Sequence, residues 1–209
     1  MATYKKGLNG PASGKVGSVI ASSWRDINYF KGHNKKSTKE PTEKQLQSRA
    51  KFRAANNFLS LVNECVQLAF IQNPERMTGR NAAQSHILTK AWKESPEGGE
   101  IDYPNVLISF GKLEPVQDAR VMSTPTGITI NWDKKAAKSQ QMIIALVDTQ
   151  RELVMESVAE INRQAGEYTF DLSNTDVDFN FHVYIGTISR DRKNASNSLY
   201  LNIIRYPTP

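Results

Sequence analysis

The stretch GITINWDKKAAKSQQMIIALVDTQRELVMES, residues 127–157, decides how most of this chain folds. It contains three short apolar or alternating runs, at residues 127–132, 141–147 and 152–157, separated by the polar segments DKKAAKSQ and DTQ. Short runs rich in Ile, Val and Leu with polar turns between them are typical of antiparallel β-strands. We therefore predict at least three consecutive strands here.

The same pattern extends in both directions along the chain. Further short runs occupy residues 103–109, 116–123, 167–172, 179–189 and 198–204, again with turn residues between them. Seven or eight such strands in roughly 100 residues are typical of an antiparallel β-sandwich of immunoglobulin or fibronectin III type. The side chains expected to point into this sandwich are Trp132, Ile143, Ala145, Phe170, Val183 and Ile185.

Two β-rich runs near the N-terminus, residues 16–21 and 27–30, predict a β-hairpin around Trp24. The preceding segment GLNGPASGKVG, residues 7–17, is interpreted as a glycine-rich loop. An isolated hairpin is only marginally stable in water. We therefore expect its apolar side chains to rest either on the following helices or on another subunit. The segment KGHNKKSTKEP, residues 31–41, reads as an exposed linker.

Helix signals begin after this linker, where Thr42 can cap a helix and Gln45 can complete a capping box. Apolar residues then recur at helical spacing, and the first helix is expected to end at Pro74. A second helix is expected over residues 78–92. The predicted fold class is α+β, in which an N-terminal β-hairpin and a two-helix segment (residues 1–100) precede the sandwich (residues 101–209).

The composition excludes several classes of protein. Of the 209 residues, 39% are apolar and 23% are charged, which is too polar for a membrane bundle and too apolar for a disordered chain. The single cysteine, Cys65, excludes an internal disulfide framework and any multi-cysteine metal site, so we expect no metal and no cofactor. We also expect no signal peptide and no membrane insertion, and hence a cytoplasmic or virion-associated location.

Catalytic signals are weak. The three histidines fall in three different predicted elements, and Ser85 and His86 are adjacent on a predicted helix, where neighbours do not face each other. Cys65 lies in an apolar stretch that is typical of an inert core thiol. We therefore predict that the protein is not an enzyme.

The positive charge is concentrated near the N-terminus. Residues 1–55 hold 12 basic and three acidic side chains, a net charge of +9, whereas the rest of the chain has a net charge of −3. Such an asymmetry indicates a surface for nucleic acid or for an acidic protein. It is also compatible with a solvated basic segment that binds nothing.

Several short motifs run through the chain. They are Gly-Lys-Val-Gly (14–17), Ser-Ser-Trp (22–24) with Tyr29, the set Pro41, Thr42, Gln45, Arg49 and Phe52, Asn-Ala-Ala (81–83), Asp102 with Tyr103, the set Ser109, Gly111 and Leu113, and Ser-Asn-Ser (196–198) with Tyr200. Together they resemble an uncharacterised family of small basic bacterial proteins, a domain of unknown function with a glycine-rich hairpin, a helix pair and an immunoglobulin-like domain. The resemblance covers nearly the whole chain and implies this architecture without an activity.

The functional hypothesis that follows is a non-catalytic structural or interaction protein. Trp24, Tyr29 and Phe30 lie on a small element with too little chain to bury them, as expected for an arm that docks on a second copy or on another assembly protein, such as that of a virion or mobile element. The intramolecular alternative is that they cover the helix pair.

The alternative function is sequence-nonspecific nucleic-acid binding. The residues that would contact phosphates are Lys5, Lys6, Lys15, Arg25, Lys31, Lys35, Lys36 and Lys39. A third option, a glycan-binding or adhesion sandwich, fits the predicted fold only by analogy, and the absence of an export signal counts against it.

Overall fold

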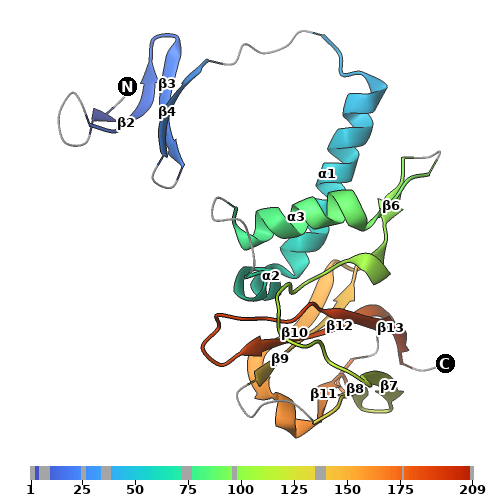
Figure 1. The fold of residues 1–209 in the computed structure, drawn as a ribbon. Helices are drawn as coiled ribbons and strands as arrows, with labels where there is room; N and C mark the ends of the chain where they lie inside the picture. Colours follow the sequence, from blue (N-terminus) through green and yellow to red (C-terminus); the bar gives the residue numbers. More distant parts are fainter. Residues whose placement is uncertain are drawn as a thin grey trace. The chain divides into compact units, whose positions relative to one another are not determined.

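A computed structural model describes residues 3–4, 10–24, 27–33, 39–71, 77–95, 98–134, 140–175 and 177–207 (Figure 1). By its internal contacts the chain divides into two units, Met1–Thr42 and Glu43–Pro209. The structure confirms an α+β protein with antiparallel sheets.

The first unit is a four-stranded antiparallel sheet in the order β1-β2-β3-β4. Its strands are β1 (Thr3–Tyr4), β2 (Ala12–Val16), β3 (Val19–Trp24) and β4 (Ile27–Gly32). The expected hairpin is present as β3 and β4, but the prediction of a loop over residues 7–17 was wrong for its second half, which forms β2. Gly17 has a φ of +56° and begins the two-residue loop between β2 and β3, a place where hairpins need a positive φ.

The second unit begins with three helices rather than the predicted two: α1 (Glu43–Leu61), α2 (Asn63–Ala69) and α3 (Gly79–Lys90). The first predicted helix breaks at Val62. There Arg80 of α3 donates to the Leu59 carbonyl at 3.0 Å and to Asn63 Oδ1 at 2.9 Å, which satisfies an orphaned carbonyl at the end of α1. None of the described helices is long and apolar enough to cross a membrane.

Two larger sheets follow, and a small hairpin of β5 (Trp92–Lys93) and β6 (Glu100–Ile101) precedes them. The three-stranded sheet has the order β11-β8-β7, with β7 (Arg120–Thr124), β8 (Gly127–Asn131) and β11 (Glu167–Asp171). The four-stranded sheet has the order β10-β9-β12-β13, with β9 (Gln140–Asp148), β10 (Leu153–Asn162), β12 (Phe179–Ser189) and β13 (Leu199–Tyr206). Seven of the eight expected runs therefore contain strands.

The eighth expected strand, at residues 103–109, is replaced by a 3₁₀ turn over Tyr103–Asn105 and an extended segment. In this segment a side chain takes the place of a strand partner, because the N–H of Ile108 donates a hydrogen bond to Ser198 Oγ at 2.9 Å. A second 3₁₀ turn, Arg163–Ala165, follows β10.

The four-stranded sheet lies between the helices and the three-stranded sheet (Figure 1), and its central strands β9 and β12 are buried on both faces. All six side chains expected to be inward are buried, and Trp132, Phe170, Val183 and Ile185 lie in a core to which both large sheets contribute. Ile143 and Ala145 instead belong to a core shared with the three helices. Because helices and sheet share this core, the contact division falls after Thr42, whereas the sequence pattern placed the boundary at residue 100.

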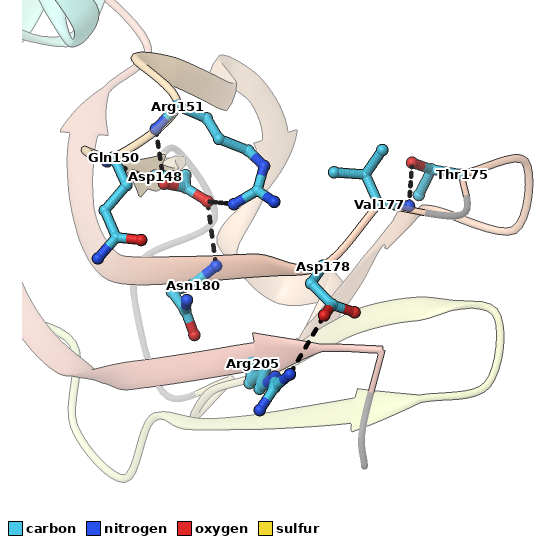
Figure 2. A network of polar contacts seen from close by, with 8 residues as sticks. All are labelled: Asp148, Gln150, Arg151, Thr175, Val177, Asp178, Asn180 and Arg205. Atoms are coloured by element: carbon cyan, nitrogen blue, oxygen red, sulfur yellow. Dashed lines mark hydrogen bonds and ion pairs between the residues drawn. The ribbon is translucent and has the colours of Figure 1, made fainter.

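A buried carboxylate holds the β9–β10 turn against β12 (Figure 2). Asp148 Oδ1 accepts the N–H groups of Gln150 and Arg151 at 3.0 Å each, and Oδ2 accepts the N–H of Asn180 at 3.1 Å. The Arg151 guanidinium lies 3.7 Å from Oδ2. Both oxygens of this side chain, which is 1% exposed, therefore act as acceptors.

We expect Asp148→Asn to lower the free energy of unfolding by about 2 kcal/mol, because the amide presents a donor to one set of buried N–H groups. Urea denaturation measures this change. Asp178→Asn is the control, because its partner Arg205 and Asp178 itself are both 56% exposed, and we expect it to cost less than about 1 kcal/mol. Equal losses in the two variants would contradict a structural role for the Asp148 carboxylate.

Candidate assembly interface

The N-terminal sheet carries the three residues that the sequence selected as an interaction surface. Trp24 ends β3, and Tyr29 and Phe30 lie in β4, with exposed fractions of 49%, 41% and 71%. The register pairs Trp24 with Ile27, Ser22 with Tyr29 and Ala21 with Phe30. Because paired residues share a face and successive residues alternate, the structure brings Trp24 and Tyr29 together and places Phe30 on the opposite face.

Two surfaces can therefore be defined on this sheet. The aromatic face consists of Lys15, Ile20, Trp24, Ile27, Tyr29 and Lys31. The Phe30 face consists of Val16, Val19, Ala21 and Phe30. Sequence reasoning missed the exposed Val16, Val19 and Ile27, although the alternation of side chains along a strand was a signal for them.

This sheet has almost no core of its own. Among the described apolar residues of the first unit, only Ala12 and Ala21 are buried, whereas every large apolar side chain of the two faces except the half-buried Ile20 is exposed. A shallow hollow of about 290 Å³ lies beside Pro11, Ala21 and Phe30. A sheet of this size needs cover on at least one apolar face to be stable.

Strand β4 also presents a sheet edge. It lies at the end of the strand order and, among the described strands, it pairs only with β3. All six of its residues are exposed, none is proline, and Lys31 is its one charged side chain. Such an edge carries backbone donors and acceptors that can pair with another strand.

The predicted basic residues are placed unevenly. Lys15 and Lys31 both pair across to Ile20, so they share the aromatic face, and the exposed Lys39 follows the sheet. The remaining predicted contacts lie outside the described residues: Lys5, Lys6, Arg25, Lys35 and Lys36. Strands β2, β3 and β4 contain no Asp or Glu. Residues 1–42 hold eight basic and two acidic side chains, so the chain's whole net charge of +6 resides there.

Both histidines of the second unit, His86 and His182, are partly buried. His182 stacks on the Tyr103 ring at a centroid distance of 4.1 Å, and its Nδ1 lies 3.1 Å from the Tyr200 hydroxyl. Burial lowers the pKa of His182, against a smaller opposite effect of Asp148, and burial also lowers the pKa of His86. In the part of the chain that the structure describes, neither ring hydrogen-bonds to a serine or a carboxylate.

The buried thiol of Cys65 donates to Glu156 Oε2 at 3.1 Å. Burial raises the pKa of the Cys65 thiol, and the negative charge of Glu156 raises it further. Burial likewise raises the pKa of Glu156. A thiol that stays neutral is a poor nucleophile. Within the described ranges, no three His, Cys, Asp or Glu side chains are grouped to hold a metal ion.

A groove of about 620 Å³ in the second unit was not predictable from the sequence. Phe58 and Leu61 of α1, Trp92 of β5, and Tyr103 line it together with Glu152 from the β9–β10 turn. These residues come from four separate segments, so no local pattern indicates that they meet. A second hollow of about 400 Å³ lies beside His86 and Phe110.

Two of the sequence motifs meet in the structure. The Gly111 N–H donates to Asn197 Oδ1 at 3.2 Å, the Ser198 N–H donates to the Ser109 carbonyl at 3.1 Å, and the Leu113 N–H donates to the Ala195 carbonyl at 2.9 Å. Residues 108–113, which we call the strap, are therefore bound to the loop before β13. This motif pair has a structural role.

The sequence profile of the Family of unknown function (DUF6266) matches residues 11–202. The chain belongs to this family. The DUF6266 match begins just before β2 and ends within β13, so it covers β2, β3 and β4 of the N-terminal sheet and most of the second unit. No curated protein and no solved structure matches the chain significantly.

Proposed function

We propose that this protein is a non-catalytic structural protein that assembles with further copies of itself through its N-terminal sheet. The observation that carries the proposal is the exposure of large apolar side chains on both faces of a sheet in which, among the described apolar residues, only Ala12 and Ala21 are buried. Folding such a sheet alone leaves its apolar area in water. Contact with a partner removes that area and supplies the missing core.

In this proposal residues 101–209 of the second unit form a rigid sandwich of immunoglobulin or fibronectin III type. A three-stranded and a four-stranded antiparallel sheet contribute to one core, and the chain passes between them from β8 to β9, from β10 to β11 and from β11 to β12. These crossings resemble the Greek-key connections of that fold.

The proposed contact is strand addition at β4. Two β4 strands related by a two-fold axis through Tyr29 pair antiparallel, with Tyr29 opposite its symmetry mate and Ile27 opposite Lys31. This register keeps each face continuous across the dimer, whereas a shift of one residue brings unlike faces together. The two Phe30 side chains then lie near the axis on the Phe30 face, and further copies can cover that face. The contact is self-complementary, as a two-fold interface requires.

Light scattering after size exclusion tests the proposal with the full chain. The protein concentration is about 50 µM, which is above the Kd of micromolar complexes. We expect a particle that contains two or more copies of the 23.4 kDa chain. Phe30→Lys places a charge in the contact, so we expect dissociation and at least a ~10-fold weaker assembly, equivalent to about 1.4 kcal/mol.

The matched control is Phe52→Lys, because Phe52 is an exposed phenylalanine (54%) on α1 of the second unit. It should leave the mass unchanged. A wild-type monomer would overturn self-assembly. If that monomer also lost thermal stability on Phe30→Lys, the N-terminal sheet would instead be covered by its own chain. Self-assembly would also be overturned if the chain always copurified with a different protein and formed no particle of its own.

A further inference from the structure

The aromatic face has a composition that strand addition at β4 does not explain. Trp24 and Tyr29 are diagonal neighbours across β3 and β4, and both are about half exposed. Lys15 on β2 and Lys31 on β4 lie on either side of Ile20 on the same face. With strands about 4.8 Å apart, the two lysine Cα atoms are separated by about 10 Å.

We propose that the aromatic face binds single-stranded nucleic acid without sequence preference. Exposed aromatic rings give bases a surface on which to stack, and nearby lysines neutralise the phosphates that link those bases. A base in a duplex is already stacked and paired, so it gains nothing from Trp24 or Tyr29. The face therefore favours single strands over duplexes.

The charge distribution supports a polyanionic ligand. Strands β2, β3 and β4 contain no carboxylate, and residues 1–42 have a net charge of +6, whereas the remaining residues are neutral overall. The positive potential is thus concentrated on the unit that carries the exposed rings. An anionic membrane also attracts lysines, and vesicle binding is therefore compared with nucleic-acid binding in the test below. Here the two lysines lie in one cross-strand row with Ile20, and Tyr29 and Trp24 follow in the next two rows of the same face.

This inference goes beyond the proposed assembly, which uses the β4 edge and the Phe30 face. An experiment can therefore contradict the assembly without contradicting nucleic-acid binding, and the reverse. Loss of assembly changes the mass of the particle, whereas loss of the aromatic face changes binding to nucleic acid. In a two-fold β4 dimer the aromatic faces are continuous, so a longer single strand can contact both copies.

Fluorescence anisotropy of labelled dT20 with the full chain tests the inference. At about 50 mM salt we expect binding that weakens with salt, with a log–log slope of about 0.7 for each phosphate neutralised. We expect weaker binding to a 20-base-pair duplex. Trp24→Leu, which keeps an apolar side chain but removes the ring, should weaken dT20 binding about ten-fold, and Trp24→Phe should retain most of it. Lys15→Gln with Lys31→Gln should lower the slope by about 1.4.

The control is Phe52→Leu, which removes an exposed ring from the second unit and should bind dT20 as the wild type does. Circular dichroism confirms that each variant retains its strands, and light scattering on the same samples reports assembly separately. The inference is overturned if dT20 does not bind, if the duplex binds equally well, or if Trp24→Leu binds normally. Binding to vesicles with phosphatidylserine but not to dT20 would assign the face to a membrane surface instead.

Discussion

Arg163→Ala is expected to lower the free energy of unfolding by about 3–5 kcal/mol, because it leaves a carboxylate unpaired in a buried site. The Arg163 side chain is 4% exposed and that of Asp133 is 11% exposed, and Arg163 Nη2 lies 2.8 Å from Asp133 Oδ1. Arg163 Nη1 donates to Gln140 Oε1 at 2.9 Å. The Arg163 carbonyl accepts the Trp132 indole N–H at 2.7 Å, so this turn also orients a core side chain.

Guanidinium denaturation measures the loss. The control is Arg205→Ala, which removes the exposed ion pair with Asp178 and should cost less than about 1 kcal/mol. A double variant, Arg163→Ala with Asp133→Ala, should cost less than the sum of the two single changes, because neither charge is then left without its partner. Similar losses for Arg163→Ala and Arg205→Ala would show that the buried pair contributes no more than a surface pair.

Gly111→Ala is expected to cost about 3 kcal/mol through overpacking against a rigid backbone. A Cβ on Gly111 would lie 2.0 Å from the Ala195 carbonyl oxygen and 2.6 Å from its carbon. The strap must then move away from the loop before β13. That movement breaks the hydrogen bond from the Leu113 N–H to the same carbonyl.

The matched control is Gly32→Ala, since a Cβ on Gly32 meets no atom within 4 Å. We expect its effect on stability to stay within about 0.5 kcal/mol. Thermal unfolding followed by circular dichroism compares the two variants. If Gly111→Ala unfolds at the wild-type temperature, the strap is not held closely against Ala195.

The strands and helix starts were largely predictable because their signals are local. The alternation of residues 127–132 predicted β8, and Thr78, whose Oγ1 accepts the Asn81 N–H at 3.2 Å, caps α3 near where the second helix was expected to begin. The predictions failed where a distant side chain intervened. Arg80 stabilises the break after α1, and Ser198 binds the backbone of the strap in place of a strand partner.

The sequence indicated part of the candidate interface, but neither its exposed valines and Ile27 nor its arrangement. The sequence selected Trp24, Tyr29 and Phe30 because the surrounding chain is too short to bury them. The period of a strand already separates Tyr29 from Phe30, but only the pairing of β2, β3 and β4 shows that Lys15 and Lys31 flank Ile20 on the face of Trp24. Five of the eight predicted basic contacts lie outside the described residues, so their roles remain predictions.

By itself the sequence determined the α+β class, membership of the family, the basic N-terminal segment and most strand positions, since these depend on composition, motifs and short-range periodicity. Only the tertiary structure decided that the helices share a core with β9, β10 and β12, and which side chains share a face of the N-terminal sheet. The physical reason is that facing and burial depend on which distant segments pair, and a local pattern of apolar residues does not specify its partner.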